Sequence, residues 1–143
     1  MKTGKITVAL RSVLGFIFVA APIATAFHLA PQPALPPTAA ALVAALTATG
    51  YMLPLLWSVE IFAGVLLLSG FMVPLALVML APVIVNIAAF HLFLDPKGFP
   101  PAIMVTMLEV SLGWRYRQAF EPLFGIARGH QTSPTREVRA HAV

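Results

Sequence analysis

The chain has 143 residues, of which 59% are hydrophobic and only 10% are charged, and its mean hydropathy is +0.91. Ordinary soluble domains carry about 25% charged residues, so this composition excludes a soluble globular fold and indicates an integral membrane protein. At about 20 residues for each transmembrane helix, the length allows four spans and no separate soluble domain. The absence of cysteine excludes thiolate catalysis and cysteine-bound iron–sulfur clusters in this chain.

The sequence pI is near 10.1. The positions of the basic residues explain this value without binding of nucleic acid. Lys2, Lys5 and Arg11 lie at the start of the chain, and Lys97 is the single basic residue between Ser12 and a C-terminal group. That group consists of Arg115, Arg117, Arg128, Arg136 and Arg139. Basic residues on both sides of an apolar block are what the positive-inside rule produces in a membrane protein.

The first transmembrane helix is predicted from Ile6 to His28. A cleaved signal peptide is the alternative, because Lys2 and Lys5 precede an apolar run and the segment 24–26 (Ala-Thr-Ala) has the form of a cleavage site. The apolar run continues beyond that segment only to Ala30, so the sequence leaves both interpretations open.

A proline-rich linker and a short helix follow the first span. Residues 31–37 contain four prolines, which favour an extended backbone. The segment from Thr38 to Thr49 is rich in alanine and leucine, with Thr38 as the expected N-cap and Gly50 as the expected C-cap. A helix of this length reaches only about 18 Å, so it is expected to lie at the external membrane interface.

Three further spans are predicted, at Tyr51–Ser69, Val73–Leu94 and Ala102–Phe120, with a bend at Pro82. Residues 125–143 form a polar, basic tail that is expected to be disordered. The predicted fold class is an all-α, up-down four-helix transmembrane bundle over residues 1–124, with a short interfacial helix between spans one and two. The basic ends place both termini in the cytoplasm, and we expect the bacterial cytoplasmic (inner) membrane.

Few polar side chains lie inside the predicted spans, and each costs several kcal/mol unless it faces the bundle interior or a cavity. At about 1.5 Å per residue, Glu60 lies about 13 Å from the external face, Asn86 about 12 Å and Glu109 about 10 Å. His91 is shallower, at about 5 Å, and His28 lies at the external edge. These groups are expected to trace a path from the external face to the middle of the membrane.

Glu60 and Glu109 each have a glycine four residues further along, at Gly64 and Gly113. Their helices are diagonal neighbours in an up-down bundle, and the glycines are expected to let the backbones come close, so the two carboxyl groups would share a cavity open to the external side. Two carboxyl groups at short range in a low dielectric cannot both be charged, so a shared proton is expected. The alternative is that each is a protonated group that hydrogen-bonds a neighbouring helix.

The candidate catalytic residues are therefore Glu60, Glu109 and His91, and the candidate cofactor-binding residues are Trp57, Asn86 and His28. Structural alternatives stay open for several of them. Asn86 would form a hydrogen bond between two helices, and Trp57 would pack against neighbouring side chains. His91 would form an interfacial hydrogen bond with Asp95, which lies one helical turn away.

Two other pairings are disfavoured. Arg11 is expected to extend to the cytoplasmic surface rather than pair with Glu60, because helix side chains lean toward the N-terminus. Haem held by His28 and His91 is disfavoured because His28 sits at the water boundary. No metal-binding motif is present in the sequence.

A series of short features runs through the chain, none of them specific alone: Arg11 with Gly15, Thr49-Gly50-Tyr51 with Pro54-Leu55-Leu56, Glu60 with Gly64, Pro74–Leu77, Pro82–Asn86, His91–Leu94, and Glu109 followed by Trp114, Tyr116 and Phe120. In order and spacing these features resemble the DoxX family of small four-span membrane proteins, over roughly Arg11 to Phe124. Members of that family often carry a lysine near the external end of span one, where this chain has His28. The resemblance favours a retained first span over a signal peptide.

The resemblance implies quinone-linked redox chemistry with a partner, because some DoxX relatives are membrane subunits of thiosulfate:quinone oxidoreductase. In that hypothesis a quinone is the cofactor, Glu60 exchanges protons with its head group, and His91 relays them outward. Another membrane or periplasmic subunit would supply the electrons. Two alternatives are a small proton-coupled transporter, which lacks the expected paired broken helices, and a non-catalytic scaffold that assembles with itself or other subunits in the lipid bilayer.

Overall fold

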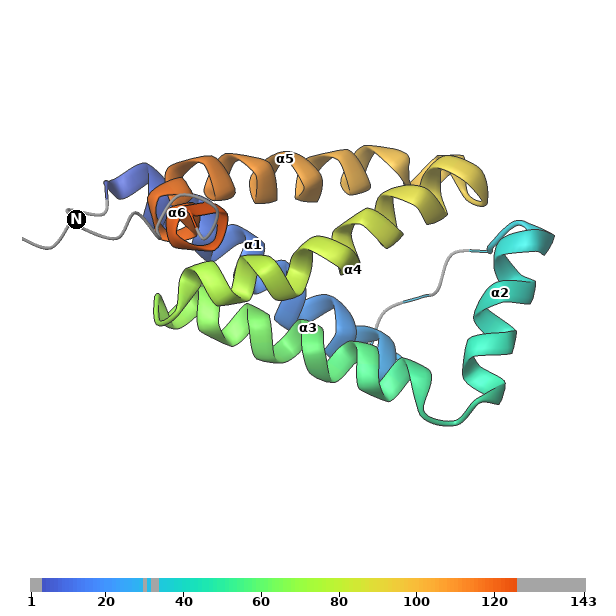
Figure 1. The fold of residues 1–143 in the computed structure, drawn as a ribbon. Coiled ribbons are helices and arrows are strands. Elements are labelled where there is room, and N and C mark those ends of the chain that lie inside the picture. Colours follow the sequence, from blue (N-terminus) through green and yellow to red (C-terminus); the bar gives the residue numbers. More distant parts are fainter. Residues whose placement is uncertain (1–3, 30, 32–33, 126–143) are drawn as a thin grey trace, which may run out of the picture.

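All regular structure in residues 4–29, 31 and 34–125, the part of the chain that the computed structural model describes, is helical (Figure 1). The elements are α1 (Lys5–Ala26), α2 (Pro37–Ala48), α3 (Met52–Ser69), α4 (Val73–Phe93), the short 3-10 turn η1 (Pro96–Gly98), α5 (Phe99–Arg115) and α6 (Arg117–Gly125). Three helices, α1, α3 and α4, are long and apolar enough to cross a membrane. This architecture is compatible with a multi-pass membrane protein. The predicted tail lies, from residue 126 onward, outside the described residues.

The four longest helices alternate around a common core. α1 packs against α3 and α5, and α4 packs against the same two helices, so α1 is diagonal to α4 and α3 is diagonal to α5. Successive helices run in opposite directions (Figure 1), which is the up-down order expected from the sequence. We call the end that holds the start of α1, the α3–α4 turn and the end of α5 the proximal end. The opposite end, where α4 is followed by η1, is the distal end.

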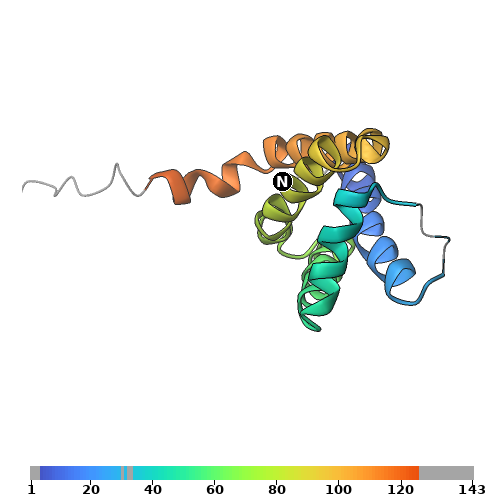
Figure 2. The same cartoon turned by 90° about the vertical axis from the view of Figure 1, so that its right-hand side faces the viewer.

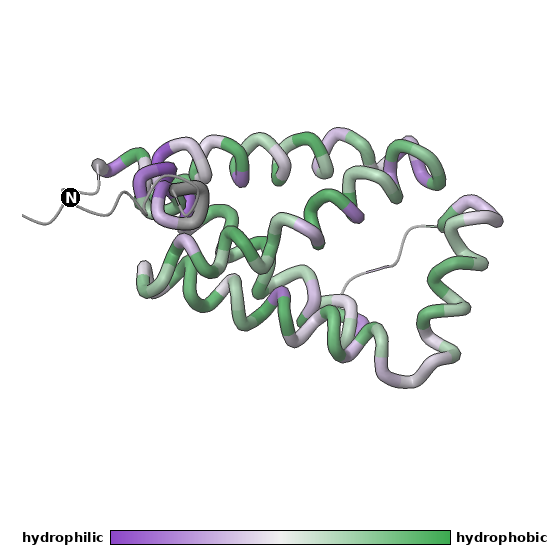
Figure 3. The backbone as a smooth tube through the Cα atoms, in the orientation of Figure 1, coloured by the Kyte–Doolittle hydropathy of each residue, from purple (hydrophilic) through white to green (hydrophobic). Residues whose placement is uncertain are grey.

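The core contains one fully buried leucine from each of these four helices: Leu14, Leu67, Leu80 and Leu112. Outward-facing positions on the same helices are also large and apolar, for example Phe16 at 66% exposed and Val85 at 68%. Figure 3 shows hydrophobic residues along every helix of the bundle. In lipid such a bundle is held together by close packing and not by the exclusion of water.

α1 and α3 cross at two glycines, Gly15 and Gly64. A β-carbon on Gly15 would lie 2.8 Å from the Gly64 carbonyl oxygen, and one on Gly64 would lie 2.9 Å from the Gly15 carbonyl oxygen and 2.8 Å from Cγ2 of Val19. These separations are too short for any residue except glycine, so the two backbones touch directly. A β-carbon on Gly113 would meet nothing within 4 Å. The expectation that Gly113 mediates a close helix approach was therefore wrong.

α4 contains Pro82 in its interior. Proline removes one backbone hydrogen bond of a helix, and its ring collides with the preceding turn, which bends the helix. Figure 1 shows α4 lying beside α3 in its first half and rising away from α3 toward α5 in its second half. The course of α4 thus agrees with the predicted bend, and it separates the distal halves of α3 and α4.

α2 lies outside the ring of four helices, beside the distal end of α3 (Figures 1 and 2). Thr49 joins the two helices, because its hydroxyl donates to the Leu46 carbonyl oxygen at 2.6 Å and accepts from the Met52 backbone N–H at 3.1 Å. Gly50, between them, has a left-handed φ of 75°, which glycine adopts without strain. This short connection holds α2 against α3 and away from α5.

The ends of α1 and α2 differ from the prediction. α1 ends at Ala26, so His28 lies beyond the helix in a turn with a left-handed φ of 51°, and not at the end of a span. α2 begins at Pro37 with Pro36 as its N-cap residue, so Thr38 is not the N-cap. A proline at the first helical position has no N–H for a cap to satisfy, which explains the earlier start.

The helix predicted over 102–120 is two helices. α5 begins at Phe99, because the prolines at 100–101 fit in its first turn, where a missing N–H costs nothing. α5 ends at Arg115, and Tyr116 leaves helical geometry with φ −96° and ψ 9°. In Figure 1 α6 is seen end-on while α5 runs across the view, so the chain turns sharply where the sequence changes from apolar to polar.

We predict that Gly64→Leu destabilises the bundle, because the new side chain would push α1 off α3. Overpacking of a tight core costs about 1–3 kcal/mol, and a helix crossing between two backbones has little freedom to relax. Thermal unfolding in detergent, followed by circular dichroism, measures the loss. Gly113→Leu is the matched control, because its side chain would enter open space. Equal melting temperatures for the two variants would contradict the role of the crossing.

Candidate functional site

A small, partly open cavity of about 160 Å³ lies in the distal half of the bundle and is lined by residues of all four of the longest helices. Phe18 and Pro22 of α1 and Val105 of α5 contribute to its apolar lining. Its two ionisable side chains are Glu60 of α3 and His91 of α4. An apolar cavity with a few convergent polar groups is the usual form of a small-molecule site.

Glu60 is only 9% exposed and lies one helical turn from the α1–α3 crossing. The direct backbone contact at Gly64 fixes how α1 lies across α3, and this places the buried Phe18 and Pro22 over the cavity that Glu60 lines. Among the residues that the structure describes, no lysine or arginine lines the cavity, and His91 is the one lining group that can exchange a proton with Glu60.

His91 is held by the loop that follows α4. Its Nδ1 lies 3.1 Å from the backbone carbonyl oxygen of Asp95 and 3.5 Å from the Asp95 carboxylate. The ring stands edge-on to Phe90 and lies so close to Gly98 that a β-carbon there would overlap it. A neutral ring that donates from Nδ1 to a carbonyl keeps Nε2 as an acceptor. The contact with Asp95 that the structural alternative gave to His91 is present, with the backbone carbonyl oxygen as the hydrogen-bond partner.

The three groups Glu60, His91 and Asp95 form a short series from the cavity to the distal end. Asp95 is 8% exposed, and the next residues, Pro96 and Lys97, are exposed. Proton transfer needs titratable groups within reach of each other or of a bridging water. Glu60 and His91 line one cavity and His91 contacts Asp95, so titratable groups follow one another from the interior to the distal loop.

Glu109 does not line this cavity. It lies on the core side of α5, between Val105 and Leu112, and its Oε2 atom is buried without a hydrogen-bond partner in the described part of the chain. The cavity ends at Val105, one turn or about 6 Å before Glu109. α5 begins three residues earlier than Ala102, so about 4.5 Å more helix precedes Glu109 than expected. Glu60 thus shares its cavity with His91 and not with Glu109.

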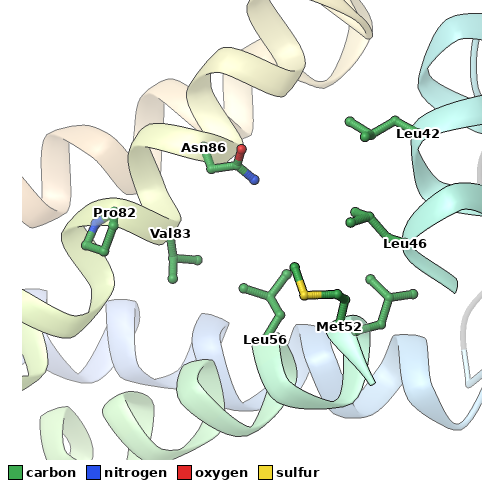
Figure 4. Close-up of a pocket in the computed structure, with 8 residues that line it drawn as sticks. Leu42, Leu46, Met52, Leu56, Pro82, Val83 and Asn86 are labelled. Atoms are coloured by element: carbon green, nitrogen blue, oxygen red, sulfur yellow. The ribbon is translucent and has the colours of Figure 1, made fainter. Parts of the chain in front are cut away.

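The three predicted cofactor-binding residues lie apart from one another. Asn86 is exposed and lines a separate pocket on the outside of α4 (Figure 4). Trp57 is half-buried on α3, one turn from Glu60, and His28 is exposed in the turn after α1. His28 does not line the cavity that holds His91, so the structure gives the bis-histidine haem hypothesis no support.

Two arginines are held at the proximal end, away from the cavity. Arg115 donates a hydrogen bond from Nη1 to the hydroxyl of the buried Thr7, at 3.0 Å. The guanidinium of Arg11 lies against Gly70 in the α3–α4 turn. Arg11 therefore extends to the proximal end and does not pair with Glu60, as expected from the direction of helix side chains.

Within residues 4–29, 31 and 34–125, no three His, Asp or Glu side chains gather in a way that would hold a metal ion. Comparisons with protein-family models, with curated proteins and with solved structures find no match to this chain. The resemblance to the DoxX family thus stays a prediction from the sequence.

Gly98 is a site residue that sequence reasoning missed. It lies seven residues after His91 in the loop Asp95-Pro96-Lys97-Gly98, and its missing side chain leaves the space that the imidazole occupies. Its φ of −84° is open to any residue, so the glycine is needed for space and not for backbone conformation. The sequence signal for Gly98 is a glycine in a tight loop that directly follows a helix with a histidine in its last turn.

We predict that Gly98→Ala displaces the His91 ring, because the new methyl group would overlap it. Imidazole ¹⁵N chemical shifts in detergent, assigned with His91→Gln, report the change. Lys97→Ala, at the neighbouring exposed position, should leave the His91 resonances in place. Unchanged resonances in Gly98→Ala would contradict this placement of the ring.

Proposed function

We propose that the chain is a four-span protein of the bacterial cytoplasmic membrane with both termini in the cytoplasm. Among the described basic residues, Lys5, Arg11, Arg115 and Arg117 belong to the proximal end, whereas the distal end has Lys97 next to the acidic Asp95. The positive-inside rule places the more basic end in the cytoplasm. This asymmetry supports a cytoplasmic proximal end and an external distal end.

In this proposal α5 is the fourth span and α2 is an interfacial helix. The 17 residues of α5 reach about 25 Å, which is close to the thickness of the hydrocarbon core. Trp114, 71% exposed, and Arg115 end the helix with the residue types that anchor spans at the membrane surface. The 12 residues of α2 are too few to span, and its place outside the ring at the distal end suits the external interface.

The cavity of Glu60 and His91 carries the functional part of the proposal, which is that the chain binds the head group of a quinone as a DoxX-like membrane subunit. Cavities of about 150 Å³ bind a single six-membered ring, and this one has about 160 Å³. Its apolar walls suit the ring, and the Glu60 carboxyl group, when protonated, can donate a hydrogen bond to a quinone oxygen. A quinone dissolved in the bilayer reaches such a site without crossing water.

Reduction of a quinone to a quinol consumes two electrons and two protons. Glu60 would pass the two protons to the quinone oxygens in turn, and His91 would relay each replacement proton to Glu60 from the external side through Asp95. The chain has no cysteine and no dinucleotide-binding fingerprint, so a partner subunit must supply the electrons. The partner would be a membrane or periplasmic oxidoreductase.

A non-catalytic scaffold is the second candidate, because large apolar side chains such as Phe62 and Val110 are exposed on the outside of the bundle and would suit contacts with other membrane chains. Purification in mild detergent separates the candidates. Recovery of quinone with an oxidoreductase subunit supports the redox proposal, and recovery of membrane chains without quinone supports the scaffold. A solute gradient formed by the purified chain in vesicles would instead support the transporter hypothesis.

The first prediction from this proposal concerns topology. A reporter fused after Val143 should be cytoplasmic, and one inserted in the connection 95–98 should be external, because α5 crosses the membrane between them. Paired alkaline phosphatase and fluorescent protein fusions measure the two sides. If both positions report the same side, α5 does not span and the four-span proposal fails.

The second prediction concerns quinone binding. Glu60→Leu should weaken binding of decylubiquinone about tenfold, because it removes one hydrogen bond to the ligand at similar side-chain volume. Glu60→Gln should stay within about threefold of the unchanged protein, since the amide keeps a donor. Quenching of tryptophan fluorescence in detergent, with Trp57 one turn from Glu60, follows the titration.

Two carboxyl controls sharpen that measurement. Glu121→Leu removes an exposed carboxyl on α6 and should leave binding unchanged. Glu109→Leu tests whether Glu109 belongs to the same site as Glu60, as expected from the sequence. Equal losses of quinone affinity in Glu60→Leu and Glu109→Leu would support a site shared by the two carboxyl groups. Absence of saturable binding by the unchanged protein would overturn the proposal.

A further inference from the structure

A second pocket, of about 390 Å³, lies outside the core between α2, α3 and α4 (Figure 4). It shares no lining residue with the Glu60 cavity. Seven of its eight lining side chains are apolar, and the eighth is Asn86. Its size falls within the range of small-molecule sites, about 300–1,000 Å³.

Two features of the fold create this pocket. The bend at Pro82, which itself lines the pocket, carries the distal half of α4 away from α3 (Figure 1). α2 then covers the gap from outside, with Leu42 and Leu46 facing α4 across the open space (Figure 4). Because α2 packs against α3 and is tied to it at Thr49, it forms a wall that a ligand can lie against.

Figure 4 shows the side-chain amide of Asn86 pointing into this pocket. The other seven lining side chains carry no nitrogen or oxygen atom that could pair with it. Asn86 is exposed, so its amide is accessible to a molecule in the pocket. A ligand with its own oxygen atom would accept a hydrogen bond from this amide.

We propose that this pocket binds an uncharged amphiphile, whose carbonyl or hydroxyl oxygen accepts a hydrogen bond from Asn86 and whose apolar chain lies between Leu46 and Leu56. The absence of any charged lining residue disfavours phosphate, carboxylate and ammonium head groups, since each would be buried without a counter-charge. A neutral glyceride ester and a quinone ring both present the required oxygen. The experiment separates these two sources.

A monoacylglycerol with a diazirine in its acyl chain is the probe. Irradiation of the full-length protein in detergent should give saturable labelling of the peptide that contains Leu46 and Met52, detected by mass spectrometry. Asn86→Leu should weaken probe binding about tenfold, because it removes the hydrogen bond at similar volume. Leu46→Trp should abolish labelling by filling the pocket, and because Leu46 is on α2, outside the four-helix ring, this variant leaves the bundle core intact.

Val85→Leu is the matched control, because Val85 is 68% exposed on α4 next to Asn86 and does not line the pocket. Competition then identifies the source: displacement of the probe by decylubiquinone at lower concentration than by unlabelled monoacylglycerol indicates a quinone, and the reverse indicates a glyceride. Labelling that fails to saturate, or that is equal in Asn86→Leu, Leu46→Trp and Val85→Leu, would overturn the inference. Glu60→Leu should label normally, so this result is independent of the proposed quinone cavity.

Discussion

The contact between the backbones of Gly15 and Gly64 is the constraint on which the rest of the bundle depends. In lipid, helices gain little from the hydrophobic effect, so their arrangement is decided by how closely they fit. At the glycine crossing the two backbones touch, and this contact limits the height and angle at which α1 can lie against α3. From that position α1 reaches α5 as well, where Thr7 accepts a hydrogen bond from Arg115. The cavity around Glu60 exists because α1 is fixed at the crossing and covers the space beyond it.

The sequence was sufficient for the parts of the fold that depend on hydropathy and on proline. Runs of apolar residues located the helices, and Pro82 located the bend in α4. Hydropathy does not encode how high one helix sits relative to another, since that depends on loop geometry and side-chain fit. For this reason the sequence placed Glu60 and Glu109 at one level, whereas the structure places His91 with Glu60. The same limit explains why Gly64 was matched with Gly113, although its partner is Gly15.

α4 divides the polar groups of the distal half between two spaces. Ile87 lines the inner cavity and its neighbour Asn86 lines the outer pocket, because successive residues on a helix point about 100° apart. A single helix wall thus separates a region with a carboxyl and an imidazole from a region with one neutral amide. The bend at Pro82 widens the outer pocket and brings the end of α4 toward α5. The outer pocket and the inner cavity therefore both depend on this bend.

The crossing also has a consequence for how the protein is made. Ribosomes deliver the chain from its N-terminus, at about 5–20 residues per second, so in the proposed topology α1 would enter the bilayer before the residues of α3 exist. Gly15 contacts Gly64, 49 positions later (64 − 15), and at those rates α1 would wait roughly 2–10 seconds for that partner. α3 and α4, joined by the short turn at 70–72, can instead enter as a hairpin. During that interval α1 would lie in the membrane without α3, and the face around Gly15 would be uncovered.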